Sequence, residues 1–310
     1  ELIPIAVSQV EGGAHLLDVC TALTERADED EQMRRTVKLV AQSVDAPLVI
    51  DSTEPSVIET ALKQYPGAAV VNSINLENGR ERIDQVMPLV IDHGASVIAL
   101  TIDKSEGGMA KTADVKFKVA KKIYDICVGE YGLEPGRLVF DALTFTLATG
   151  EEEFRRSAIE TIEGIRAIKA KLPGALTTLG VSNVSFGLPK AARPVVNSVF
   201  LHHCMAAGLD SAIINAAHVL PYFEIPDAER ELADDLVYNR RADALARLIE
   251  HFEGKSGAAT VAAVREDAID WDDPEALARA IHYKILHRKP QDADKCVHTL
   301  IGTHKRDAVE

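Results

Sequence analysis

The chain has 310 residues, with 34 basic against 48 acidic side chains, which gives a formal net charge of −14. This balance argues against nucleic acid as the main partner, because neutralising phosphates needs a basic surface. No apolar run approaches the roughly 18 residues of a membrane span, so no membrane partner is expected. The cysteines, Cys20, Cys127, Cys204 and Cys296, form no CxxC pair and no Cys/His grouping at metal spacing. We therefore expect free thiols, a reducing, cytoplasmic location and no metal site.

Short apolar runs rich in β-branched residues recur along the chain, and most of them end in a polar residue. In chain order they predict strands at 15–19, 48–50, 69–71, 96–102, 138–140, 177–181 and 211–214. Amphipathic patterns predict helices at the start of the chain and at 30–43, 54–64, 113–130, 151–171 and 194–208. Continuous rather than alternating hydrophobicity is typical of strands buried on both faces of a parallel sheet. The alternation therefore predicts an α/β protein of repeated βα units.

Two features favour a TIM-type (β/α)8 barrel over a doubly wound sheet. The repeats continue from residue 15 to residue 214 without a GxGxxG dinucleotide turn. Nearly every predicted strand ends in Asp or Asn, where barrel enzymes carry catalytic side chains. Seven strands are predicted rather than eight, and the sequence starts with Glu1 rather than Met. We therefore expect the barrel to lack its first strand, which would precede Glu1.

The barrel is expected to occupy residues 1–241, because the alternation stops after Arg241. Residues 242–272 are expected to form a terminal helix over 243–252 and a flexible linker around 254–257, which reads Gly-Lys-Ser-Gly. A new helix start follows at Asp272, Asp273 and Pro274, with proline at the first helical position. The two helical patterns beyond it cannot bury a core alone. Residues 273–310 are therefore expected to begin an all-helical domain that is cut off.

Polar side chains at the carboxyl ends of the predicted strands would converge on one barrel mouth. One interpretation is a Mg²⁺ site, which favours carboxylate oxygens, although no His accompanies them in a facial triad. A second is a site for a polar heterocycle, because carboxylates accept paired N–H bonds and an Asn amide both donates and accepts. A third is helix capping, which is least convincing for several residues together. The strand-end residues are Asp18, Asp51, Asn72, Asp103, Asp141, Asn183 and Asn215.

Four local strings distinguish between these interpretations. They resemble the pterin-binding barrel of cobalamin-dependent methionine synthase and of the methyltetrahydrofolate methyltransferases that feed a corrinoid iron–sulfur protein. The resemblance extends from Gln9 to the region of Arg241, where Asn239-Arg240-Arg241 matches the barrel end, and Ile281-His282-Tyr283 resembles the start of a helical cobalamin cap. The strings, in order, are Ile50-Asp51-Ser52, Val70-Val71-Asn72-Ser73-Ile74, Phe140-Asp141-Ala142 and Gly180-Val181-Ser182-Asn183-Val184-Ser185-Phe186-Gly187.

This resemblance implies roles for individual residues. Asp51, Asn72 and Asp141 align with residues that hydrogen-bond the pterin ring. Asn183 aligns with a mobile Asn that reaches N5 of methyltetrahydrofolate, so Asn183 and Asp141 are the expected catalytic residues. The remaining expected substrate contacts face the same mouth or align with a basic residue near the folate: Asp18, Asp103, Asn215 and Arg193.

The implied reaction moves the methyl group of 5-methyltetrahydrofolate from N5 to cob(I)alamin. The departing nitrogen is a poor leaving group as an anion, so it needs a proton or a strong hydrogen bond. The sequence contains neither a DxHxxG motif for cobalamin nor the cysteines of a homocysteine zinc site. The expected cofactor, cobalamin, is therefore bound outside this chain. A cobalamin-binding domain or subunit and a zinc domain that binds homocysteine are the expected partners.

Three alternatives stay open at this point. The corrinoid iron–sulfur protein methyltransferases normally end after the barrel, whereas this chain continues. Dihydropteroate synthases share the barrel but use a Ser-Arg-Lys run to receive diphosphate, where this chain has Ser182-Asn183-Val184. A non-catalytic module would bind folate without removing its methyl group. Some methionine synthases carry Pro and Asn directly after the residue that aligns with Asp141, whereas this chain has Ala142 and Leu143.

Overall fold

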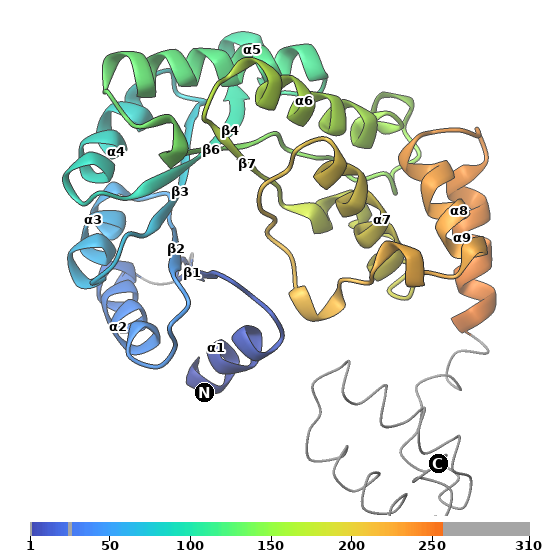
Figure 1. The fold of residues 1–310 in the computed structure, drawn as a ribbon, viewed down its shortest axis with the longest axis horizontal. Helices are drawn as coiled ribbons and strands as arrows, with labels where there is room; N and C mark the ends of the chain where they lie inside the picture. The colour runs from blue at the N-terminus through green and yellow to red at the C-terminus, as the bar shows by residue number, and fades with distance from the viewer. Residues whose placement is uncertain (1, 24–26, 257–310) are drawn as a thin grey trace, which may run out of the picture. The chain divides into compact units, whose positions relative to one another are not determined.

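The computed structural model describes residues 2–23 and 27–256, and residues 1–250 form one compact unit. Its centre is a curved parallel sheet in which neighbouring strands follow the order of the sequence (Figure 1). A short antiparallel strand, β5 (Gly108–Met109), pairs with β4 outside this path. The parallel strands are β1 (Leu17–Cys20), β2 (Leu48–Asp51), β3 (Val70–Leu76), β4 (Ser96–Asp103), β6 (Leu138–Asp141) and β7 (Leu176–Thr178).

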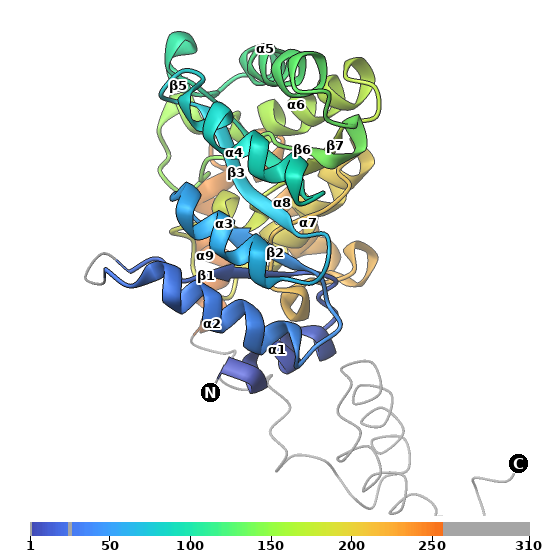
Figure 2. The same ribbon diagram turned by 90° about the vertical axis from the view of Figure 1, so that its left-hand side faces the viewer.

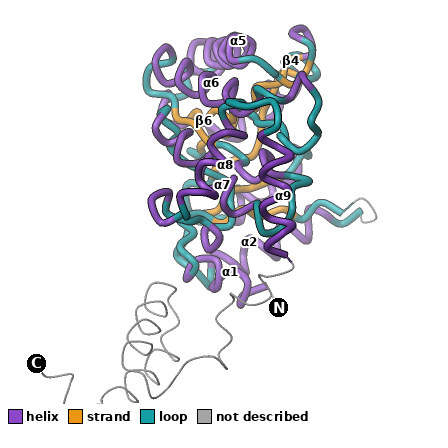
Figure 3. Tube along the Cα trace, turned by 90° about the vertical axis from the view of Figure 1, so that its right-hand side faces the viewer, coloured by secondary structure: helices purple, strands orange, loops and turns teal. Residues whose placement is uncertain are grey.

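Helices cover the outer face of this sheet. Figure 2 shows α2, α3 and α4 layered over the strands β1 to β3, and Figure 3 shows α7 and α8 on the other side of the unit. The helices that the structure describes are α1 (Leu2–Glu11), α2 (Glu29–Ala41), α3 (Pro55–Gln64), α4 (Glu81–Asp92), α5 (Ala113–Tyr124), α6 (Ser157–Lys171), α7 (Arg193–Ala206), α8 (Asp227–Val237) and α9 (Ala244–Ser256).

Local sequence explains where several helices begin. Pro55 opens α3 at a position where its missing N–H costs nothing. The Thr112 hydroxyl accepts a hydrogen bond from the Val115 amide and caps α5. Three acidic residues in the first turn of α2, at 29–31, complement the positive end of that helix. The patterns missed α4 and α8, and α4 carries Pro88, a residue that normally interrupts helices.

The strands are buried on both faces, as their continuous hydrophobicity predicts. Val49, Ile98 and Val139 form an inner cluster inside the curve of the sheet, against which Val70 and Leu100 pack. The alternate residues of the same strands are buried under the outer helices: Leu48, Ile50, Val71, Val97, Leu138 and Phe140. The predicted α/β class with a barrel-type parallel sheet is confirmed, as a six-stranded half-barrel.

The seventh predicted strand is an exception. Residues 211–214 run beside β7 and the residues that follow it, where the Ser211 and Ile213 amides donate to the carbonyls of Thr177 and Leu179. They make only an isolated parallel bridge, between Gly180 and Ile213. A parallel strand is stabilised by neighbours on both sides, and in the described part of the chain the sheet path stops at β1 on one edge and β7 on the other.

The predicted strand at 177–181 is also shorter than expected. It ends at Thr178, and residues Val181–Ser185 form a 3₁₀ turn instead. The predicted terminal helix over 243–252 corresponds to α9. The predicted linker beyond residue 256 and the predicted helical domain at 273–310 lie outside the described residues.

Candidate functional site at the strand ends

Asp51 and Asn72 lie opposite each other on neighbouring strands. The register of β2 and β3 pairs them directly. Val49 and Val70, two residues earlier, line the inner cavity, and side chains alternate along a strand, so Asp51 and Asn72 face the same interior. The Asn72 amide also hydrogen-bonds the carboxyl of Asp18, which lines that cavity from β1. The structure thus brings these three predicted residues together.

The two carboxyl groups of this cluster are electrostatically strained. Burial and the nearby charge of Asp51 raise the pKa of Asp18 to about 6, although the hydrogen bond from Asn72 acts to lower it. Burial also raises the pKa of Asp51 above its usual value. A ligand that offers N–H groups to both carboxyl groups would stabilise their charged forms.

Arg82 holds the backbone that directly follows Asp51 and Asn72. It projects from α4 and donates to the carbonyls of Ser52 (2.8 Å), Thr53 (2.5 Å) and Ser73 (3.1 Å). These carbonyls follow Asp51 and Asn72 in the sequence. One guanidinium therefore ties the residues after β2 to the backbone of β3, and burial lowers its pKa.

Asp141 stands at the end of β6 and is nearly inaccessible, with 7% of its surface exposed. Its Oδ1 accepts the Leu143 amide at 2.7 Å, and the Gly180 amide also donates to it. Burial raises its pKa to about 6, while both amides and the charge of Lys116 oppose that rise. Val139, two residues earlier, lines the cavity, so Asp141 faces the same interior as Asp51.

Asn183 is exposed and lies in the 3₁₀ turn that follows β7. Gly180, three residues before Asn183, links this segment to Asp141, because the Gly180 amide donates to the Asp141 carboxylate. A Cβ at Gly180 would lie only 3.0 Å from the Asn183 amide nitrogen. The glycine therefore permits a close approach of the Asn183 amide to the backbone that bonds Asp141.

Arg193 and Asn215 are engaged with their own loops. The Arg193 guanidinium donates to the Ser185 hydroxyl (3.2 Å) and to the Ser182 carbonyl (3.4 Å), so it braces the turn that carries Asn183. The Asn215 side chain accepts the Ala217 amide at 3.1 Å and lines the same cavity as Asp18.

Asp103 is not brought to the cluster. Ile98 belongs to the inner face of β4, and Asp103 lies five positions further along the strand, which places it on the opposite face. Its carboxylate accepts the amide and hydroxyl of Ser105 (2.8 and 2.7 Å) and pairs with Lys122 at 2.8 Å. Although burial acts to raise its pKa, these bonds hold it below its usual value.

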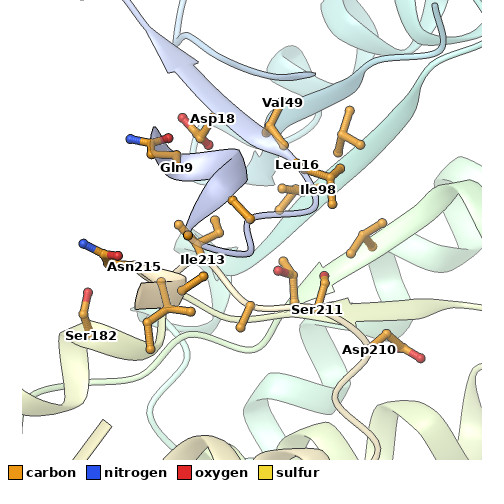
Figure 4. Close-up of a pocket in the computed structure, with 18 of the residues that line it drawn as sticks. Gln9, Leu16, Asp18, Val49, Ile98, Ser182, Asp210, Ser211, Ile213 and Asn215 are labelled. Atoms are coloured by element: carbon orange, nitrogen blue, oxygen red, sulfur yellow. The ribbon is translucent and has the colours of Figure 1, made fainter. Parts of the chain in front are cut away.

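A cavity of about 890 Å³ occupies the inside of the half-barrel. Figure 4 shows Gln9 and Asp18 on one wall and Ser182 and Asn215 on the other. Apolar side chains such as Ile98 line its interior. Its volume lies within the range of sites that bind small organic molecules, and a few polar groups on apolar walls are typical of such sites.

Three other observations concern the described residues. No group of three or more His, Cys, Asp or Glu side chains is placed to hold a metal ion there. None of the helices in that part of the chain has the length and apolar character needed to cross a bilayer. Its three cysteines are free thiols, with Cys20 exposed and Cys127 and Cys204 buried.

The fold and the site together define a half-barrel that presents carboxylate and amide groups at its mouth. The sequence profile of a family described as pterin binding enzyme matches residues 1–215. The chain belongs to this family.

Individual relatives are more specific. Two methionine synthases, from Mycobacterium tuberculosis (strain ATCC 25618 / H37Rv) and Mycobacterium leprae (strain TN), are 46% and 44% identical over 264 and 260 residues. These matches cover 83% and 82% of this chain but 22% and 21% of the relatives. The chain therefore spans about a fifth of the length of the curated relatives it matches.

Solved structures support the barrel fold. Dihydropteroate synthase from Thermus thermophilus superposes with a TM-score of 0.53 and 18% identity, covering 70% of this chain and 83% of that one. The enzyme from Xanthomonas albilineans in complex with 7,8-dihydropteroate gives a TM-score of 0.50 and 15% identity, covering 82% and 84%. At these identities the likeness concerns the fold alone.

Sequence reasoning missed three residues that shape the site, namely Arg82, Gly180 and Lys116. Arg82 and Lys116 bind mainly backbone carbonyls, and every residue has one, so the sequence does not indicate which carbonyls they bind. A signal existed for Lys116, which shares the buried face of α5 with Val119 and Ile123 at helical spacing. A lysine at such a position has to find buried acceptors.

Proposed function

We propose that this chain is the folate module of a cobalamin-dependent methionine synthase. It binds 5-methyltetrahydrofolate at the mouth of the half-barrel and gives the methyl group to cob(I)alamin that another module presents. The proposal is supported by the strand positions of Asp51, Asn72 and Asp141, which by alternation direct them towards one interior, and by the turn of Asn183, whose Gly180 amide bonds Asp141. The identity to two methionine synthases supports the choice of this enzyme within the family.

The pterin ring suits these groups chemically. One edge of the ring carries N–H, NH2 and C=O groups, which are complementary to carboxylate oxygens and an Asn amide. Because the pKa of Asp141 is about 6, its carboxyl is largely ionised at neutral pH and accepts N–H bonds. Asp51 and Asn72 offer an acceptor and an amide from the other side of the interior.

Asn183 acts on the departing nitrogen. As the bond between N5 and the methyl carbon breaks, N5 retains the electron pair and holds a proton taken up before or during the transfer. The Asn183 amide cannot supply that proton, but it can hydrogen-bond N5 and stabilise its protonated form. Its exposure at the mouth leaves it free to reach the ligand. The chain thus binds, orients and activates the methyl donor.

Cobalamin is a co-substrate for this chain rather than a resident group, because the sequence carries no DxHxxG motif to hold it. The expected partners are therefore a cobalamin-bearing module and, for complete methionine synthesis, a zinc module that binds homocysteine.

The test uses the 310-residue chain with ligands added in solution. Equilibrium titration with 5-methyltetrahydrofolate measures binding, and anaerobic mixing with free cob(I)alamin measures methyl transfer by the loss of cob(I)alamin absorbance. We expect saturable binding and a transfer rate above that of the uncatalysed mixture. Binding without transfer would identify a non-catalytic folate module, and absence of binding would refute the proposal.

A further inference from the structure

The ammonium of Lys116 is fully buried behind the site, on the inner face of α5. It donates hydrogen bonds to three backbone carbonyls, those of Ala110 (2.8 Å), Ala142 (2.7 Å) and Leu143 (3.1 Å). Three acceptors match the three N–H donors of an ammonium group. A buried charge is normally offset by a carboxylate partner, whereas here carbonyl dipoles provide the close contacts.

The neighbouring helix leaves room for this side chain. Gly164 of α6 faces Lys116, and a Cβ at that position would lie 2.8 Å from Lys116 Cδ. A glycine inside a helix reduces its stability relative to alanine. Two unfavourable features, an interior glycine and a buried charge, therefore coincide at one place. This indicates that the ammonium position has a function.

Two of the three carbonyls that Lys116 binds, those of Ala142 and Leu143, belong to the turn after Asp141. Leu143 has a φ of +56°, a left-handed conformation that costs energy for a residue with a Cβ. Its amide donates to Asp141 Oδ1 at 2.7 Å, while the Thr161 hydroxyl donates to its carbonyl at 2.8 Å. The same turn therefore presents its N–H to the carboxylate and its C=O groups to the cation.

We propose that Lys116 is a positioning residue for Asp141: it holds the Asp141–Leu143 turn in its strained conformation and favours the charged form of the carboxyl group that receives the pterin. This inference rests on the proposed function. Among the described residues, the charged groups that act on the ammonium are Asp141 of β6 and Glu160 of α6. Lys116 in turn is the charged side chain that acts on Asp141.

The protonation states of Lys116 and Asp141 should then limit the pH range in which folate binds well. Burial lowers the pKa of Lys116 to about 8, with Asp141 and Glu160 opposing, and burial raises the pKa of Asp141 to about 6. Asp141 loses its charge as the pH falls through about 6, and Lys116 loses its charge as the pH rises through about 8. Affinity for 5-methyltetrahydrofolate should therefore be highest between these values and fall on both sides.

The experiment compares Lys116→Met with Lys121→Met. Lys121 lies on the same helix but is exposed and paired with Asp125, so its variant controls for the loss of a lysine. Affinity for 5-methyltetrahydrofolate is measured by titration at a series of pH values, and circular dichroism checks the fold. In Lys116→Met we expect no loss of affinity as the pH rises through about 8. The loss of affinity at acid pH, which follows protonation of Asp141, should occur at a pH about one unit higher than in the parent chain. At pH 6 the affinity should then fall by about fivefold or more.

The outcomes separate the two proposals. A parent chain that fails to bind folate at any pH refutes the proposed function, whereas a folded Lys116→Met with the profile of Lys121→Met overturns only the role of Lys116. If Lys116→Met does not fold, Gly164→Ala tests the same inference. Its methyl group crowds Lys116 Cδ and displaces the ammonium without removing the charge. We expect Gly164→Ala to fold and to bind 5-methyltetrahydrofolate at least about threefold more weakly than the parent chain. Unchanged affinity would reject the inference.

Discussion

The two sides of the barrel mouth hold their carboxyl groups in different ways. On the side of β1 to β3, the charge of Asp51 disfavours ionisation of Asp18, and Asn72 hydrogen-bonds Asp18. On the side of β6 and β7, Asp141 stands alone, holds two backbone amides and has a cation behind its turn. The first arrangement is open to the ligand, and the second is fixed before the ligand arrives.

This difference indicates that the two sides of the mouth contribute to ligand binding in different ways. A fixed carboxylate sets the orientation of the ring, since its direction is determined by backbone amides and not by a rotatable side chain. The strained pair can adapt, because bonds from the ligand relieve its repulsion. Perturbing either side should therefore affect binding differently, and perturbing Asn183 should affect the reaction itself.

The largest effect is expected for Asn183→Ala. Methyl transfer to cob(I)alamin should slow by about 10- to 1000-fold, the range for removing one preorganised donor. Affinity for 5-methyltetrahydrofolate should change little, because the pterin edge is bound elsewhere. Single-turnover kinetics beside equilibrium titration measure both. A transfer rate equal to that of the parent chain would remove Asn183 from the reaction.

Asp141→Asn is expected to weaken folate binding by about 10- to 100-fold at neutral pH, since hydrogen bonds to a charged group are lost. Isothermal titration calorimetry provides the measurement. Asp92→Asn is the matched control, because Asp92 is exposed at the end of α4. Equal affinities for the two variants would contradict the assigned role.

Gly180→Ala should slow methyl transfer by about tenfold, because its Cβ would lie 3.0 Å from the Asn183 amide nitrogen and displace it. Gly129→Ala serves as control, since a Cβ there meets no atom within 4 Å. Transfer rates of both variants are compared at saturating folate. The idea of a close approach fails if the two substitutions behave alike.

The smallest effect is expected for the stability of Asp18→Asn. A carboxyl whose pKa is raised from 3.8 to about 6 in the folded chain disfavours folding once it ionises. The neutral amide should therefore increase stability at pH 7 by about 1 kcal/mol or less, because solvent screens this open site. The gain should disappear as the pH falls towards 4. Urea unfolding at both pH values measures it, and a gain that persists at pH 4 would need another cause.

The sequence predicts much of the sheet because most of its strands are buried on both faces. The ends of β2 and β6 were predicted to within one residue, so Asp51 and Asp141 lie at strand ends as expected, whereas β3 continues past Asn72 to Leu76. Asp103 shows the limit of such a prediction. The run before it is apolar on both faces, so nothing in the sequence reveals which face its last residue occupies.

Tertiary constraints account for the rest. Residues 211–214 have the composition of a strand but form a single bridge, because pairing depends on neighbours that the local sequence does not describe. Arg82 and Lys116 bind carbonyls from segments far away in the chain, up to 30 residues for Arg82. Only the folded structure shows which carbonyls come within reach of these cations.

The exposed thiol of Cys20 has a practical consequence. It ends β1 in register with Asp51, at the rim where the methyl donor is proposed to bind. Burial raises the pKa of the other two described thiols, Cys127 and Cys204, well above that of a reactive cysteine. With Cys296 replaced by serine, a fluorophore attached at Cys20 would therefore report ligand arrival directly, and folate would in turn protect this sulfur from alkylation.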